Sequence, residues 1–516
     1  MSRLENSAKN IVFNMSGNIL DSLLGIVSRT VFIYVLGAEY LGLAGLLGNV
    51  IGFLSISELG IATAIGFSLY KPLAQKDYDL VSSLMSLYRK AYQLIALIVS
   101  VCGIGLFFFL DFFVPTEQQP PETDLAYFVF LISTVLGYLL SYKTTLISSD
   151  NQGFKIAPIG MIMSVVQCCV QVICLLIFRS YVSYLFVLLI CSVTRMIWVN
   201  CYVTKKYESV NFKSKKPVDG TTKTQLKRNV SGLIIAKIGD YLVNSTDNLI
   251  ITKLVSLATT GIYSNYLLIR NLVNGYIGTL FSGITASMGN VVATESNERK
   301  LKIFETLMFC AYFLYSFEAI CFMCLFNTFI GDIWLGSEFV FDEFTVFIIV
   351  INNYLTGLRI PLITMKGVAG KHLEDAWTPF AFAVINLVSS IILAYYMGVA
   401  GVFLGTIIGS LLTADWYRPI IIYKHVFQTS VKKYYKVYLK YVALGLAGLA
   451  VSYCICSLIS TPYALVNLAL KAIIAALFPI LMNVAIFRKT EEFKAILDMY
   501  NRLISKFKRN KGNVHE

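Results

Sequence analysis

Polar side chains recur at helical spacing inside apolar stretches of this chain. The segment 11–36 holds five such positions, at spacings of 4, 3, 4 and 4 residues: Asn14, Asn18, Asp21, Gly25 and Arg29. This spacing places them on one face of a helix. A Lys, Arg or Asp at the centre of a membrane-spanning helix costs about 2.5–3.5 kcal/mol on insertion scales, so such residues face a bundle interior or a wet cavity. The pattern therefore predicts a polar cavity beside this segment.

Other apolar segments carry similar polar positions. Four cations and two amides are predicted to line the cavity and bind substrate: Arg29, Arg270, Lys237, Arg359, Asn18 and Asn274. Five acids are predicted to balance these cations or to carry a coupling ion: Asp21, Glu58, Asp240, Asp247 and Glu318. Arg270 lies about 15 Å from the expected outer end of its helix, at 1.5 Å per residue. That depth favours a cavity over snorkelling to the membrane surface.

Structural explanations compete with this interpretation at several positions. Lys237 and Asp240 are one turn apart and could simply neutralise each other. Arg359 lies about one and a half turns from its expected helix end, so snorkelling and cavity lining both fit. Asp415 and Arg418, three residues apart, are expected to form a local ion pair.

The elements that must position these residues are membrane-spanning helices. Hydrophobic residues make up 57% of the 516 and charged residues only 14%, against about 25% in soluble domains. A span needs about twenty mostly apolar residues. This criterion predicts an all-α polytopic membrane protein of fourteen spans: 11–36, 41–70, 88–113, 125–147, 157–178, 182–204, 229–254, 260–289, 304–328, 343–364, 377–397, 399–423, 437–459 and 464–487.

Lys and Arg residues gather on one side of this topology. With fourteen spans both termini share that side, which holds 34 of the 43 basic residues, eight of them in the loop 205–228. Basic loops stay in the cytoplasm. We therefore expect a bacterial plasma membrane protein with both termini cytoplasmic. The net charge of +13 reflects topology and attraction to anionic lipids, so it implies no nucleic-acid partner.

The chain also contains a weak internal repeat. An offset of 219 residues places Asp21 on Asp240 and Gly42 on Gly261. It predicts two parallel six-helix lobes related by a pseudo-two-fold axis along the membrane normal. The expected parts are an N-terminal lobe (11–204), a basic linker (205–228), a C-terminal lobe (229–423), two extra helices (437–487) and a basic cytoplasmic tail (488–516).

Catalytic and metal-binding signatures are missing from the sequence. No Gly-rich phosphate loop of the Walker type occurs, so ATP hydrolysis is not expected. Cys321 and Cys324 form a CxxC in an apolar run without a second pair, which is typical of buried hydrophobes. We expect no catalytic residues, no metal and no cofactor, with coupling to H⁺ or Na⁺ left open.

Three local stretches carry a family resemblance. Arg29 with the following TVFIYVLGAEYLGL, residues 245–269 with STDNLIITKLV and TGIYSNYLLI, and DIWLGSEF at 332–339 resemble Wzx-type oligosaccharide flippases. These form the polysaccharide-flippase branch of the MATE-like (MOP) exporter superfamily. The order and spacing of the matches extend over about 490 residues.

The resemblance implies a function. It implies alternating-access translocation of an undecaprenyl-diphosphate-linked oligosaccharide to the outer leaflet, for O-antigen, capsule or exopolysaccharide. Membrane lipids, and a polysaccharide polymerase with glycosyltransferases, are the partners it suggests. Three alternatives stay open: a lipid II flippase of the MurJ type, a MATE-type multidrug exporter, and a membrane-embedded enzyme of glycan assembly.

Overall fold

All regular structure in the described residues is helical. This computed structural model describes residues 3–54, 58, 61–113, 119–218, 220, 246–370, 374–375 and 377–498, and these contain no strand. Helices suit a bilayer because they satisfy every backbone N–H and C=O within one segment, where no water is at hand. The expected all-α fold is confirmed. The chain divides into two compact units, Met1–Leu272 and Val273–Glu516.

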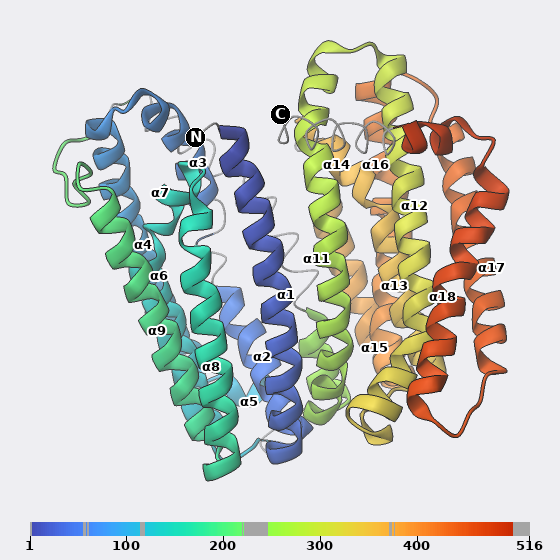
Figure 1. Ribbon diagram of the computed structural model, residues 1–516, viewed down its shortest axis with the longest axis horizontal. Helices are drawn as coiled ribbons and strands as arrows, with labels where there is room; N and C mark the ends of the chain where they lie inside the picture. Colours follow the sequence, from blue (N-terminus) through green and yellow to red (C-terminus); the bar gives the residue numbers. More distant parts are fainter. Residues whose placement is uncertain are drawn as a thin grey trace, which may run out of the picture. The chain divides into compact units, whose positions relative to one another are not determined.

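Unit 1 holds the N-terminal helices (Figure 1). In it, α8 packs against α1 and α9, and α6 packs against α4 and α9. Residues 246–254 are also helical, and α11 (Leu257–Thr294) begins in this unit and runs across its boundary. The remaining elements are α1 (Arg3–Leu36), α2 (Ala38–Leu54), α3 (Ile61–Gln75), α4 (Tyr78–Phe107), α5 (Leu110–Phe113), α6 (Thr123–Ser141), α7 (Thr144–Ser149), η3 (Gly153–Lys155), α8 (Ala157–Phe178) and α9 (Tyr181–Lys206).

Unit 2 is organised around α12 (Asn297–Asn327), which packs against α13, α17 and α18. The rings of Tyr312 on α12 and Tyr441 on α17 stack with centroids 4.5 Å apart, so the two extra C-terminal helices belong to the packed core of this unit. Its other elements are η4 (Thr328–Trp334), η5 (Ser337–Phe339), α13 (Glu343–Leu358), α14 (Ile360–Val368), α15 (Thr378–Leu412), α16 (Ala414–Ile422), η6 (Tyr423–Phe427), α17 (Lys432–Ser457) and α18 (Ala464–Phe487).

Most of the expected spans coincide with helices. The described residues include ten stretches long and apolar enough to cross a membrane. The expected spans 157–178 and 464–487 share their bounds with α8 and α18. Within the expected span 41–70 the structure describes α2 and α3, and residues 55–57 and 59–60 between them lie outside the described residues. Most of 229–254 lies outside the described residues, so the total of fourteen stays a prediction.

Helix bounds repeat at the offset found in the sequence. Helices α2 and α11 begin at Ala38 and Leu257, and α4 and α12 begin at Tyr78 and Asn297, both pairs 219 residues apart. The N-caps of α4 and α12 also correspond: the side chains of Asp77 and Ser296 each accept a hydrogen bond from the backbone N–H three residues on. The same kind of N-cap thus satisfies a backbone N–H in the first turn of both helices. The exact lobe and linker limits stay predictions.

Two glycines related by this repeat touch each other in unit 1. A Cβ on Gly42 would lie 2.0 Å from the carbonyl oxygen of Leu257, and one on Gly261 would lie 2.1 Å from that of Ala38. The start of α2 is set by Gly37, whose φ of +89° ends α1 one residue earlier. Small residues allow backbones to approach this closely in membranes.

A second glycine stripe forms a helical hairpin in unit 2. Gly398 (φ +55°) interrupts α15 at the point where the sequence separates the spans 377–397 and 399–423. Beyond it, Gly401, Gly405 and Gly409 face the first arm of α15: a Cβ on Gly405 would lie 2.3 Å from Ser390 Oγ. Ser390 Oγ in turn donates to the carbonyl of Val402 at 2.8 Å, so the two arms pack without room for side chains.

We expect Gly42→Ala and Gly261→Ala each to destabilise the protein by about 1–3 kcal/mol, because the added methyl forces α2 and α11 apart. Gly45→Ala is the matched control, since a Cβ there meets nothing within 4 Å. Thermal unfolding of the purified protein in detergent measures the difference. Equal melting temperatures for Gly42→Ala and Gly45→Ala would contradict the close contact.

Candidate functional site

Unit 1 contains a polar cavity of about 330 Å³ beside the predicted face of α1. Helix α1 contributes Asp21, Gly25, Ser28 and Arg29, three of which the spacing of polar residues had placed on one face. The other polar groups in its lining come from α8 and α9: Ser164, Gln167, Gln171 and Tyr184. These are donors and acceptors suited to hydroxyl groups and anions.

Arg29 is the cation of this cavity, and its partners are neutral. Its Nη1 donates to the backbone oxygen of Ser264 at 2.6 Å, to Ser264 Oγ at 3.1 Å and to Asn265 Oδ1 at 3.3 Å. A guanidinium carries five N–H donors. Those on Nε and Nη2 have no partner among the described residues. The side chain is thus held in place and keeps donors for a ligand.

Arg270 lies elsewhere in unit 1, on α11. Its Nη2 donates to Asn271 Oδ1 at 3.5 Å, and it also hydrogen-bonds Tyr263, on which Asp247 acts electrostatically. The predicted cation Arg270 and the predicted acid Asp247 therefore share one aromatic neighbour. Asn18, on α1, is exposed and does not line the Arg29 cavity.

The predicted acids occupy different surroundings. Asp21 lines the Arg29 cavity, whereas Glu58 accepts a hydrogen bond from Tyr92 Oη on α4. Glu318, on α12, is 2% exposed in the interior of unit 2. Lys237 and Asp240 lie outside the described residues, so their pairing and their roles stay predictions.

In unit 2, Asn274 of α11 meets α13. Its Nδ2 donates to Asn353 Oδ1 at 3.0 Å. Asn353 and its neighbour Asn352 are both buried, each 7% exposed. Buried amides form hydrogen bonds because an unpaired polar group costs about 1–3 kcal/mol. Asn274 thus has a structural partner within its unit.

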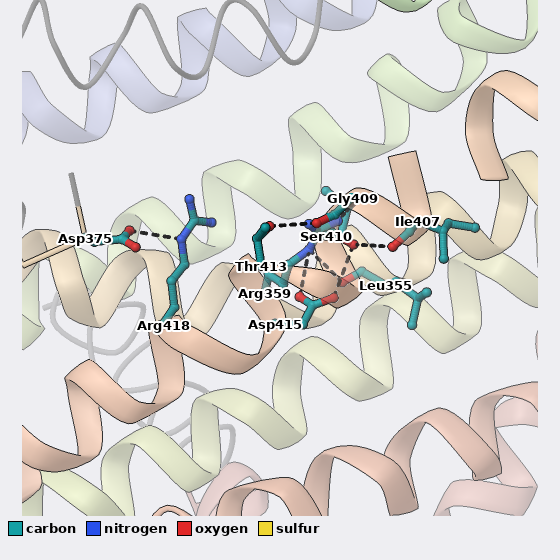
Figure 2. Close-up of polar contacts among 10 residues, drawn as sticks. Leu355, Arg359, Asp375, Ile407, Gly409, Ser410, Thr413, Asp415 and Arg418 are labelled. Atoms are coloured by element: carbon teal, nitrogen blue, oxygen red, sulfur yellow. Dashed lines mark hydrogen bonds and ion pairs between the residues drawn. The ribbon is translucent and has the colours of Figure 1, made fainter. Parts of the chain in front are cut away.

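Arg359 is committed to a buried ion pair (Figure 2). It ends α13, its Nε lies 3.6 Å from Asp415 Oδ1, and its Nη2 donates to Thr356 Oγ1 at 2.7 Å. Ser410 Oγ donates to the other carboxylate oxygen at 3.2 Å. Arg359 is only 6% exposed, so its side chain does not snorkel to the membrane surface. Its place in a substrate cavity stays a prediction.

The expected pair of Asp415 with Arg418 was wrong. Arg418 Nε instead donates to Asp375 Oδ2 at 3.0 Å, as Figure 2 shows, and Lys366 Nζ lies 2.5 Å from the same oxygen. Asp375 is fully buried, and a buried carboxylate attracts any cation whose helix brings it close. Asp375 comes from the segment before α15, so the spacing of residues along α16 cannot predict its pairing with Arg418.

Several site residues were missed at the sequence level. Gln167, Gln171 and Tyr184 complete the Arg29 cavity, and Asn353 bonds Asn274. The two glutamines are four residues apart in an apolar run, the same helical spacing that revealed the face of α1. The helical spacing of polar residues within an apolar run therefore marks uncharged cavity residues as well as charged ones.

We expect Arg359→Leu to lower stability by about 3–5 kcal/mol, because it leaves Asp415 buried without its cation. Adding Asp415→Leu should restore the melting temperature and membrane abundance. Lys433→Met is the control, since its ion pair with Glu305 at 2.6 Å is 63% exposed at the lysine and worth about 0–1 kcal/mol. If the single and double variants melt alike, the pair is not what holds α13 to α16.

Comparisons with known proteins agree with this architecture. The family model described as polysaccharide biosynthesis protein matches residues 7–285, more than half of the chain. No curated protein matches. The solved structure of the lipid II flippase MurJ, inward closed, superposes with a TM-score of 0.64 at 12% identity, covering 93% of this chain and 99% of that one.

Two MATE transporters share the fold as well. An inward-facing multidrug resistance MATE family transporter of the MOP superfamily gives a TM-score of 0.62 at 14% identity, covering 79% of this chain and 96% of that one. The Vibrio cholerae MATE transporter VcmN in its bent form gives 0.54 at 14% identity, with 83% and 98% covered. These likenesses establish a MATE-like fold, and the family match establishes that the chain belongs to the polysaccharide biosynthesis protein family.

Proposed function

We propose that the chain is a flippase that moves an undecaprenyl-diphosphate-linked oligosaccharide from the cytoplasmic to the outer leaflet of a bacterial plasma membrane. The observation that carries the proposal is the Arg29 cavity of unit 1, where a cation with free donors lies beside neutral hydrogen-bonding groups and one acid, Asp21, inside an apolar helical protein. The family match to polysaccharide biosynthesis supports a glycan-bearing cargo.

The chemistry of the cavity suits this cargo. A diphosphate carries about two negative charges, and the planar guanidinium of Arg29 can bind two phosphate oxygens at once. Gln167, Gln171 and Tyr184 can bond sugar hydroxyls. The isoprenoid chain is apolar, so it can remain in lipid while the head group crosses. Alternating access, with Asp21 as charge balance or as a site for H⁺ or Na⁺, completes the proposal.

The alternatives differ in cargo or in chemistry. A MurJ-like activity would move lipid II, and a MATE-like activity would transport drugs, by analogy with the lipid II flippase MurJ and the multidrug resistance MATE transporter described above. An enzyme of glycan assembly would need acid–base or metal residues. The described residues contain no group of three or more His, Cys, Asp or Glu that could hold a metal.

Complementation in two strains separates these cargoes. In a strain without its own oligosaccharide flippase, we expect the chain to restore surface polymer; in a strain depleted of its lipid II flippase, we expect no rescue of growth. Arg29→Ala should abolish the surface polymer at unchanged membrane abundance, because the cavity loses the only arginine in its described lining. Arg299→Ala, at an exposed position on α12, is the control.

Arg29→Lys refines this test, since it keeps the charge but loses the fork that binds two oxygens. We expect export between that of the wild type and that of Arg29→Ala. Normal surface polymer with Arg29→Ala would remove the head-group role from this residue. Rescue of the lipid II strain alone would assign the MurJ-type cargo.

The proposed orientation has both termini in the cytoplasm, and reporter fusions test it. Fusions at residues 120, 336 and 461 should report the outside, and those at 150, 215 and 510 the cytoplasm. The expectation follows from the concentration of Lys and Arg on one side of the chain. An outside signal at 215 would overturn the orientation.

A further inference from the structure

A second cavity of unit 1 lies near the C-terminal end of α9, whereas Tyr184 lies near the N-terminal end of that helix. Its volume is about 910 Å³, and α4, α6, α9 and the segment 210–213 form its walls. It shares no lining residue with the Arg29 cavity. The three helices lie side by side in the left part of Figure 1, and α6 packs against both α4 and α9.

Four cations line this pocket, and its described lining contains no acid. They are Arg89 on α4, Lys143 after α6, Lys205 on α9, and Lys213 beyond α9. None of the four has a carboxylate partner among the described residues. Four like charges around one space repel each other, and an anion bound in that space would reduce this repulsion.

Lys143 is positioned within the pocket by neutral contacts. Its Nζ donates to Thr204 Oγ1 at 2.6 Å and lies 4.5 Å from the centre of the Phe212 ring. A cation over an aromatic face is held there by the ring quadrupole. The ammonium group is thus fixed in place with its charge uncompensated.

Two acids near this end of unit 1 are bound elsewhere, and a third, Glu208, is exposed and lies outside the pocket lining. Asp79 pairs with Lys216 at 2.9 Å, outside the pocket lining. Asp150 accepts hydrogen bonds from Tyr207 Oη at 2.7 Å and from Gln152 Nε2 at 2.5 Å. Burial and the hydrogen bond to Asp150 raise the pKa of Tyr207, so this phenol stays a donor at neutral pH.

Exposed apolar side chains continue from the pocket along all three helices. On α4 they follow Gln93 of the pocket lining. On α6 they run from Leu139 of the lining to a position seven residues earlier, and on α9 they run in the same way from Ile197. The members are Leu94, Leu97, Ile98 and Val101 on α4, Ile132 and Leu139 on α6, and Ile190 and Ile197 on α9. Each stripe leads away from the cations toward the middle of its span.

We propose that this pocket binds the phosphate head group of an anionic phospholipid, with its acyl chains along the three apolar stripes. Basic pockets between transmembrane helices on the cytoplasmic side bind such head groups. The placement in the cytoplasmic leaflet rests on the orientation proposed above. Stripes on three helices suit the two or more chains of a phospholipid better than one isoprenoid chain or a soluble anion.

Lipid titration of the purified full-length protein, followed by native mass spectrometry, tests the site. We expect phosphatidylglycerol to bind in preference to phosphatidylcholine. Each Lys or Arg near an anionic lipid is worth about a fivefold change in Kd, so Arg89→Gln with Lys143→Gln should weaken binding of phosphatidylglycerol about 25-fold. The control is Lys90→Gln with Lys215→Gln, which removes the same charge from neighbouring exposed positions outside the lining.

Melting temperatures of both double variants show whether each is folded. Equal phosphatidylglycerol affinity of the two folded variants would overturn the proposal, and so would equal binding of the two lipids by the wild type. Preferential binding of undecaprenyl diphosphate, or displacement of phosphatidylglycerol by inorganic pyrophosphate, would also overturn it. None of these measurements depends on transport, so failure of the flippase proposal would leave the result intact.

Discussion

A charge that leaves water must be neutralised or kept wet, and this constraint explains the surroundings of several buried ionic groups in the described part of the protein. In unit 2, Arg359 pairs with Asp415, and Lys366 and Arg418 share Asp375. These pairs tie α13 and α14 to α16 and to the segment before α15. Arg29 in unit 1 has only neutral partners among the described residues. The same energetic rule therefore separates cations that hold helices together from a cation that lines a cavity.

In a membrane, apolar side chains provide no hydrophobic driving force for helix association, because the surrounding lipid is as apolar as they are. Helix association relies on close packing and hydrogen bonds instead. Glycine meets this demand at several described positions, among them Gly42 against Gly261 in unit 1 and the stripe Gly401, Gly405 and Gly409 in the α15 hairpin. Backbone atoms occupy the space that a Cβ would need at Gly42, Gly261 and Gly401, Ser390 occupies it at Gly405, and the ring of Phe382 lies closest at Gly409.

Much of the fold was predictable because membrane spans and helical faces leave strong patterns. Span length and hydropathy located α8 and α18 to the residue, and the 219-residue offset recurs in helix starts and N-caps. The face of α1 at Asp21, Gly25 and Arg29 does line one cavity. Pairings between distant segments could not be predicted: Asp415 faces Arg359 because α13 and α16 pack together, and no spacing within α16 encodes that choice.

The position of the cavity cation depends on the glycine contact through a short chain of bonds. Gly261 packs against Ala38 at the start of α2, and the hydroxyl of Ser264, one turn along α11, donates to the carbonyl of Gly261 at 2.6 Å. Arg29 donates to both oxygens of Ser264, and Gly37 turns the chain from α1 directly into α2. Arg29 is therefore fixed relative to α11 in two ways. Its side chain is hydrogen-bonded to Ser264 of α11, and the turn at Gly37 joins its helix to the start of α2, which contacts Gly261 of α11. Because backbone atoms of a helix move together, any shift of α11 against α2 must also move the hydrogen-bond acceptors of Arg29, which couples helix packing to the cavity.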